Sequence, residues 1–164
     1  MAFRLEGPWR AWRVADGRYP LFDGTGAMRH GSRWNSPGRR VIHAAETYAG
    51  ALLETLVHAS GRVPRHHVYI EIEIPASVAM EVVEPGDVPG WDGEDLAASR
   101  HFGDRWYDER RSAVLLVPSV VTRVERNVLI HQEHPDFGRL RAGAPLAVRW
   151  DARLWSERHS SGWA

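Results

Sequence analysis

The segment 31–38 carries the densest group of side chains that could bind a charged ligand. It reads Gly-Ser-Arg-Trp-Asn-Ser-Pro-Gly, so Arg33, Trp34 and Asn35 bring a guanidinium, an indole and an amide together. Its glycines and proline favour turns, and a guanidinium binds phosphate through two parallel hydrogen bonds. The segment therefore indicates a loop that grips a phosphorylated, aromatic ligand. The alternative is a loop that Trp34 anchors, with Arg33 in an ion pair.

Glu54 and Ser119 are two further candidates outside this loop. Glu54 lies in residues 46–59, where apolar residues recur at helical spacing, and it falls away from their arc. It is expected to be a solvated glutamate unless another element faces it. Ser119 lies in the apolar run 113–124, where a buried hydroxyl without a partner costs about 1–3 kcal/mol. It is expected either to bond the backbone beside Pro118 or to serve the site. The apolar arc of the helix consists of Ala49, Leu52, Leu53, Leu56 and Val57.

Several common kinds of catalytic site have no signature in this chain. Cysteine is absent, which excludes thiolate catalysis and cysteine-ligated metals. The pair His66-His67 and the spacing His131-x-x-His134 lack the accompanying residues of a zinc motif, so no metal is expected. The chain has no Gly-x-Ser-x-Gly, Gly-x-Gly-x-x-Gly or Walker sequence, which disfavours serine hydrolases of that type and standard dinucleotide folds.

The elements that must position these residues follow from the hydrophobic pattern. Strict alternation over residues 67–74 predicts a half-buried strand, and the run 113–124 predicts a central strand bent at its proline. Residues 84–94 are rich in turn formers and predict a surface excursion. More strands than helices indicate an α+β fold rather than a doubly wound parallel sheet. The other expected elements are strands at 11–14, 19–22, 40–44, 128–131 and 146–150, a helix at 96–111 and a long ordered loop at 23–38.

Length and charge narrow the function further. The 164 residues suit a single domain, residues 1–164, and 43% hydrophobic residues are typical of a folded globular protein. The 21 acidic residues balance 21 basic ones, all of them arginine, so direct nucleic-acid binding is not expected. Without lysine there is no Schiff-base chemistry. No apolar run reaches the ~18 residues of a membrane span, which predicts a soluble, cytoplasmic protein.

Several short motifs, taken together and in order, resemble the RES-domain family, which is named after an arginine, a glutamate and a serine. The resemblance covers residues 10–154 or thereabouts, nearly the whole chain. It implies a single RES domain with an ADP-ribosyltransferase-like mixed sheet core and flanking helices. The motifs are Trp12-Arg13, Gly24-x-Gly26-Ala27, the segment 31–38, Ala51-Leu52-Leu53-Glu54, Val117-Pro118-Ser119-Val120 and Asn127-x-Leu129.

The resemblance implies the toxin of a type II toxin–antitoxin system, which degrades NAD at the nicotinamide–ribose bond and arrests growth. NAD is then the substrate of a phosphorolysis or a hydrolysis, with inorganic phosphate as the co-substrate in the first case and no metal in either. The alternatives are an ADP-ribosyltransferase that modifies a bacterial protein, and an inactive module that only binds its antitoxin. The implied partner is a cognate Xre-like, DNA-binding antitoxin that blocks the active site, within a toxin–antitoxin complex that can be of higher order.

The resemblance also implies roles for individual residues. Arg33, Glu54 and Ser119 correspond to the three residues in the family's name. A carboxylate bound to a ribose hydroxyl stabilises the positive charge that develops on the sugar, which suits Glu54. Arg33 is expected to hold the pyrophosphate or an incoming phosphate, with Arg13 as a helper. Ser119 is expected to bond the nicotinamide amide or to orient Glu54. The further ligand-binding candidates are Trp34, Asn35, Tyr48 and Asn127.

Two positions depart from the family's usual pattern. His43 stands where the family usually has a tyrosine, and Ser32 stands where a second glycine is common. His43 is kept among the catalytic candidates, since its ring, like that of Tyr48, can stack on a base or on nicotinamide. The first departure bears on the role of the ring more than on the reaction class.

Overall fold

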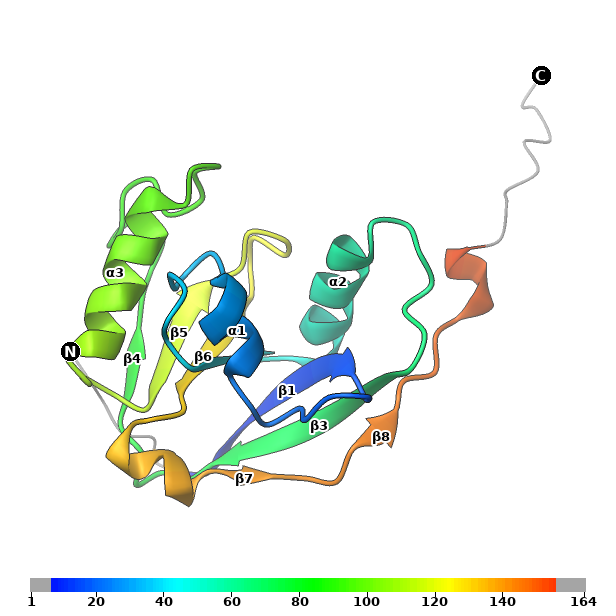
Figure 1. Ribbon diagram of the computed structural model, residues 1–164, viewed down its shortest axis with the longest axis horizontal. Helices are drawn as coiled ribbons and strands as arrows, with labels where there is room; N and C mark the ends of the chain where they lie inside the picture. Colours follow the sequence, from blue (N-terminus) through cyan, green and yellow to red (C-terminus); the bar gives the residue numbers. More distant parts are fainter. Residues whose placement is uncertain (1–6, 156–164) are drawn as a thin grey trace.

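A single sheet of eight strands organises the chain in the computed structural model, which describes residues 7–155 (Figure 1). The helices and strands, in chain order, are β1 (Trp9–Asp16), α1 (Thr25–His30), β2 (Val41–Ala45), α2 (Tyr48–Ala59), β3 (His67–Ile74), β4 (Met80–Val82), α3 (Ala97–Asp108), β5 (Val114–Pro118), β6 (Arg126–His131), β7 (Arg141–Ala142) and β8 (Leu146–Ala147), with short 3-10 helices at Pro135–Arg139 and Ala152–Leu154. The strand order is β4-β5-β6-β2-β1-β3-β7, and β8 also pairs with β3. This mixed sheet with few helices confirms the α+β prediction.

The sheet is split between β1 and β2. These two strands share a single register pair, Trp12 with Ala45. By contrast, β1 pairs with β3 along its whole length, and β2 pairs with β6 along its whole length. Helix α2 packs on both β1 and β2 where they diverge (Figure 1). The sheet therefore consists of two well-paired halves that meet at one point, with α2 lying over the split.

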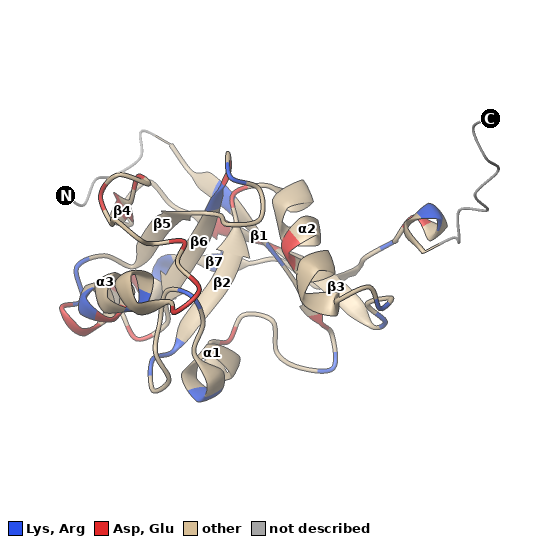
Figure 2. Ribbon diagram, turned by 90° about the horizontal axis from the view of Figure 1, so that it is seen from above, with Lys and Arg blue, Asp and Glu red and all other residues tan. Residues whose placement is uncertain are grey.

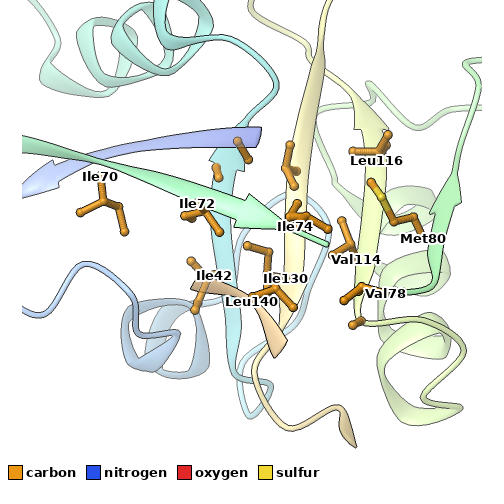
Figure 3. Packing of buried hydrophobic residues seen from close by; sticks show 14 of the residues in the cluster. Ile42, Ile70, Ile72, Ile74, Val78, Met80, Val114, Leu116, Ile130 and Leu140 are labelled. Carbon is orange, nitrogen blue, oxygen red and sulfur yellow. The ribbon is translucent and has the colours of Figure 1, made fainter. Parts of the chain in front are cut away.

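Alternating residues send the apolar side chains of the sheet to two opposite faces. On β5, Val114 and Leu116 join one core cluster, and Leu115 and Val117 join another. The first cluster contains most of the buried aliphatic side chains, among them those of β3 (Figure 3). Because β3 spans 67–74 and buries its alternate residues, the prediction for that strand is confirmed.

Helix α3 and the segment 31–38 cover the second cluster. Trp34 is 3% exposed, and its ring stacks on that of Trp91 at 6.2 Å and meets the ring of Phe102 edge-on at 6.3 Å. Trp106 and Tyr107 of α3 lie in the same cluster. Trp34 therefore anchors its loop, as one of the two sequence interpretations predicted.

His131, at the end of β6, is a fully buried polar residue that is held in its neutral form. Its ring stacks on Tyr107 at 3.7 Å and donates from Nε2 to the Tyr107 carbonyl at 3.0 Å. Its Nδ1 accepts from the Glu133 N–H at 3.2 Å, so a second ring proton would break that bond. Burial lowers the pKa of His131 to about 4.

We expect this histidine to make the fold sensitive to acid. An unfolded histidine titrates near pH 6.5. Below that pH the unfolded chain binds a proton at this histidine, whereas the native state binds it only near pH 4. The contribution of His131 is fully present above pH 6.5 and declines by up to about 3 kcal/mol as the pH falls towards 4. His131→Phe, which keeps an aromatic ring against Tyr107, should lose less stability between pH 7 and pH 4.5 than the parent in urea unfolding. His101→Phe, at an exposed position of α3, is the control. Equal losses in the parent and His131→Phe would contradict the assignment.

Some predicted elements differ from those in the structure. Residues 19–22 form no strand, because Pro20 cannot donate to a ladder and Leu21 packs against the first core cluster. The loop 23–38 contains the short helix α1. The strand predicted at 113–124 ends at Pro118, after which the chain turns and leaves Val124 90% exposed. The strand predicted at 146–150 is reduced to Leu146–Ala147.

Acidic and basic residues are interspersed over the elements of the molecule (Figure 2). Ion pairs between described residues lie mostly between partly or fully exposed side chains. Such pairs contribute little to stability individually. No helix among residues 7–155 is long and apolar enough to cross a membrane.

Candidate active site

A cavity of about 1270 Å³ is lined by β1 and β2 at the split, by α2, by β6 and by the loop that carries Arg33. Sites for small molecules usually have volumes of ~300–1,000 Å³, so this cavity has room for a ligand as large as a dinucleotide. Its lining includes six of the nine residues predicted for the site, namely Arg13, Arg33, Trp34, His43, Glu54 and Asn127. The sheet split therefore brings together candidates that are more than a hundred positions apart.

The carboxylate of Glu54 is fixed through one of its oxygens. Ser119 donates from Oγ to Glu54 Oε1 at 2.8 Å, and Asn127 donates from Nδ2 to the same oxygen at 2.8 Å. Among the described residues, Glu54 Oε2 has no hydrogen-bond partner. Because two donors hold Oε1, Oε2 is left to accept from a ligand in the cavity.

Ser119 binds the Glu54 carboxylate from the side that faces away from the cavity. It begins the turn after β5, is 1% exposed and does not line the cavity. Its hydroxyl donates to Glu54 and accepts from the N–H groups of Val121 at 3.2 Å and Thr122 at 3.1 Å. Both sequence interpretations therefore apply, since the serine bonds its own backbone and also orients Glu54. It is a positioning residue in this geometry, and its hydroxyl proton is already committed.

Arg13 crosses the split in the sheet. Its Nη1 donates to the His43 carbonyl on β2 at 2.6 Å, and its Nε is buried without a partner. Burial lowers the pKa of Arg13, and the charge of Asp23 opposes that shift. The guanidinium forms no ion pair with the described residues. A buried cation without a paired carboxylate is costly unless an anion joins it, so Arg13 is suited to bind an anionic part of a ligand.

Arg33 is held by backbone carbonyls and not by the ion pair that one sequence interpretation offered. Its Nη1 donates to the carbonyl oxygens of Trp91 at 3.2 Å and Gly93 at 3.0 Å. These carbonyls belong to the excursion predicted at 84–94, which thus positions a site residue. Helix α3 holds the same loop, because Arg100 donates to the Ser32 carbonyl at 2.8 Å. The other guanidinium nitrogens of Arg33 have no hydrogen-bond partner within residues 7–155, which leaves donors for a ligand.

His43 lines the cavity, and Asn35 lies behind it. Asn35 is 1% exposed, does not line the cavity, and contacts the ring nitrogen Nε2 of His43 at 3.0 Å. Burial lowers the pKa of His43 to about 3, and the charges of Arg13 and His58 act in the same direction. His43 is therefore neutral at physiological pH, and Asn35 supports the ring instead of facing the ligand.

Tyr48 is the predicted site residue that the structure places elsewhere. It is the first residue of α2, and its ring packs against that of Tyr69 on β3 at 4.8 Å. It does not line the cavity. The aromatic ring that sequence reasoning assigned to the ligand here supports the packing of α2 on the sheet.

The sequence prediction for the face of α2 is wrong. Leu53 and Val57, which belong to the predicted apolar arc, are 42% and 53% exposed, and the buried residues of the helix are Gly50 and Ala51. A Cβ on Gly50 would lie 2.6 Å from Glu125 Oε2, so the helix approaches the turn after β5 closely on this side. This orientation directs Glu54 towards Ser119 and Asn127, and Glu54 is not the solvated glutamate that its spacing suggested.

Sequence reasoning missed the part of the cavity between α2 and β3. Its lining there is basic and contains imidazole rings, from the end of α2 to the start of β3. The sequence feature that could have revealed it is a group of five histidines and arginines within ten positions. The adjacent histidines of this group were considered only as metal ligands. Within residues 7–155, no group of three or more histidine, aspartate and glutamate side chains is placed to hold a metal ion. The residues of this part of the lining are His58, Arg62, Arg65, His66 and His67.

The sequence model of the RES-domain family matches residues 8–151 of the chain. The chain belongs to the RES-domain family. A "Prs ADP-ribosylating toxin" of Sphingobium sp. (strain YBL2) is 41% identical over 152 residues, which cover 87% of this chain and 94% of the relative. A "Toxin Res" of Yersinia enterocolitica is 33% identical over 150 residues, which cover 87% and 97%. This RES-domain protein is accordingly a toxin of the family.

The fold of the RES-domain protein also matches a solved structure. The toxin of the M. tuberculosis MbcT-MbcA toxin–antitoxin complex superposes with a TM-score of 0.70 at 16% sequence identity. The match covers 88% of this chain and 85% of that one. At this identity the likeness concerns the fold alone, and it agrees with the RES fold that the sequence motifs implied.

Proposed function

We propose that this toxin cleaves the bond between nicotinamide and ribose in NAD. The observation that carries the proposal is the arrangement of Glu54, with Oε1 bound by Ser119 and Asn127 and Oε2 free at the cavity. A fixed carboxylate can accept from a ribose hydroxyl, and this interaction strengthens as positive charge develops on the sugar. The name of the Sphingobium relative, an ADP-ribosylating toxin, supports NAD as the substrate.

The chemistry needs no strong general acid. Nicotinamide leaves with the electron pair of its bond to ribose C1′, and its ring nitrogen changes from positive to neutral in the process. A nucleophile then forms the new bond to C1′ and releases its proton. Arg13 and Arg33 form no ion pair within residues 7–155, and both are suited to hold the pyrophosphate in place.

The nucleophile decides the overall activity. Water would give NAD hydrolysis, inorganic phosphate would give phosphorolysis, and a side chain of another protein would give ADP-ribosyl transfer. Degradation of free NAD is the first candidate, because it needs only the arrangement described. Transfer to a protein is the second, favoured by the name of the 41% identical relative.

One experiment tests the common step and separates the acceptors. Purified protein is incubated with NAD in buffer, in buffer with inorganic phosphate, and with lysate and labelled NAD. We expect release of free nicotinamide in at least one arm. ADP-ribose identifies water as the acceptor, its phosphorylated counterpart identifies phosphate, and label on a protein band identifies transfer. No nicotinamide in any arm would overturn the proposed function and leave a module that only binds a partner.

We also propose that an antitoxin binds over the cavity and blocks it. The solved neighbour forms a toxin–antitoxin complex, and a protein that depletes NAD must be kept inactive in its own cell. Addition of the cognate antitoxin should suppress nicotinamide release, and an antitoxin that binds without suppressing it would contradict this placement.

Ser119→Ala should lower the rate of NAD cleavage about tenfold and also destabilise the fold. Glu54 would keep Asn127 as a donor but lose the bond from Ser119, and one such charged hydrogen bond contributes about 1.5–3 kcal/mol. The N–H groups of Val121 and Thr122 would lose their acceptor. Nicotinamide release and urea unfolding measure the two effects. Ser36→Ala is the matched control, because the Ser36 hydroxyl bonds none of the residues that the structure describes. Full activity in Ser119→Ala would contradict the positioning role.

A further inference from the structure

The side chain of Asn35 determines which nitrogen of His43 carries the proton. Asn35 Nδ2 donates to the carbonyl oxygens of Ala27 and Ser36, both at 3.2 Å. Those two atoms can only accept, so the amide nitrogen must face them and Oδ1 must face the other way. Oδ1 accepts from the Ser32 hydroxyl at 2.6 Å and lies 3.0 Å from His43 Nε2. Because an amide oxygen cannot donate, Nε2 carries the hydrogen.

This bond leaves His43 Nδ1 as a lone pair. The ring is neutral, since burial lowers the pKa of His43 to about 3. Nδ1 has no hydrogen-bond partner among residues 7–155, and the ring lines the cavity. A neutral imidazole with a bonded Nε2–H has one hydrogen-bonding capacity left, which is to accept at Nδ1. A ligand that binds beside His43 is therefore expected to present a hydrogen-bond donor to Nδ1.

The register of the sheet places this acceptor close to Glu54. Ala45 lies opposite Asn127, which holds Glu54, and His43 lies two residues along β2 on the same face as Ala45. At ~3.3 Å per residue, the two positions are about 7 Å apart along the strand. A ligand whose ribose hydroxyl meets Glu54 therefore has its nearest substituents beside His43.

We propose that His43 Nδ1 accepts a hydrogen bond from the carboxamide N–H of the nicotinamide ring and thereby selects NAD over dinucleotides without that donor. This inference rests on the proposed function, because it takes Glu54 to bind the ribose next to the scissile bond. The phosphates of the ligand can only accept and so cannot bond the lone pair. One hydroxyl of the ribose is used by Glu54, and the other is present in every dinucleotide, so it cannot distinguish NAD from them. The carboxamide is the neutral donor next to the scissile bond that belongs to NAD and is absent from its deamidated form.

Deamidated NAD, in which the carboxamide is replaced by a carboxylate, is the direct probe. The lone pair of Nδ1 would face an anion and lose its donor, so we expect kcat/KM for nicotinic acid release to be about a hundredfold below that for nicotinamide release from NAD. His43→Phe removes the acceptor and should reduce this preference to a few-fold. His43→Asn, whose Oδ1 can take the place of Nδ1, should retain most of it. His101→Phe, at an exposed position of α3, is the control.

The outcomes separate this inference from the proposed function. Absence of nicotinamide release from NAD by the parent protein removes the proposed function itself. Equal cleavage of NAD and its deamidated form by the parent, or an undiminished preference in His43→Phe, overturns the inference while the proposed function stands.

A spectroscopic measurement keeps the inference testable if His43→Phe does not fold. Long-range proton–nitrogen correlation on the 15N-histidine-labelled parent reports the protonation of both ring nitrogens. We expect a bare Nδ1 and a protonated Nε2 from pH 8 to pH 5, and addition of a slowly cleaved NAD analogue should shift the Nδ1 signal upfield as it accepts a bond. A protonated Nδ1, or a signal that does not respond to the analogue, overturns the inference.

Discussion

Glu54→Gln should lower NAD cleavage by about two to three orders of magnitude while the protein stays folded. The substitution keeps an oxygen where Oε1 stands, so Ser119 and Asn127 can still donate to it. It removes the negative charge that, in the proposed function, stabilises the positive charge developing on the ribose. Because the loss acts on the transition state, kcat should fall much more than the affinity for NAD.

Glu73→Gln is the matched control for this experiment. Glu73 is an exposed glutamate on β3 that does not line the cavity, so its substitution removes one charge without touching the site. Nicotinamide release at saturating NAD measures the effect, and circular dichroism with urea unfolding checks the fold. Retention of more than a tenth of the parent's kcat in folded Glu54→Gln would show that the carboxylate does not have the assigned role.

Gly103→Ala should destabilise the protein by about 1–3 kcal/mol and reduce its activity at the same time. Gly103 lies in the middle of α3, where the backbone carbonyl of Trp34 packs directly on its Cα. A methyl group there would overlap that carbonyl. Alanine is intrinsically the better helix former by about 1 kcal/mol, so a net loss means that the steric overlap outweighs this gain. The loop that would be displaced also carries Arg33, so we expect the substitution to lower activity as well as stability.

Thermal unfolding and nicotinamide release together check this expectation. For a chain of this length, 1–3 kcal/mol corresponds to a fall of roughly 3–10 °C in Tm. Gly26→Ala in α1 is the control, because a Cβ there would meet nothing within 4 Å. That variant should be as stable as the parent or slightly more so. A Gly103→Ala protein that melts with the parent would show that α3 and the loop can separate without cost.

The half-buried strand and the mixed sheet were predictable because their signals are local. Apolar and polar residues alternate at consecutive positions over 67–74, and this pattern correctly predicted β3. The face of α2 was not predictable in the same way. Its orientation depends on Ser119, Asn127 and Glu125, which lie on other elements and far along the chain. Helical spacing alone pointed to Leu53 and Val57, and the structure leaves both largely exposed.

The site could be predicted by residue type more readily than by role. The motifs predicted that Arg33, Glu54 and Asn127 belong to the site, and all three line the cavity. It could not separate the residues that face the ligand from those behind them, because that distinction is made by side-chain hydrogen bonds across the sheet. Asn35 supports His43, and Ser119 supports Glu54. The backbone carbonyls that hold Arg33 have no sequence signature at all.

The divergence of β1 and β2 has a consequence for the energetics of ligand binding. These two strands share one register pair, and the Arg13 side chain spans the gap between them through its bond to the carbonyl of His43. Arg13 on β1 and His43 on β2 both line the cavity, so a ligand bound to both would connect the two halves of the sheet. We therefore expect such a ligand to hold the two halves of the sheet together and to raise the free energy of unfolding.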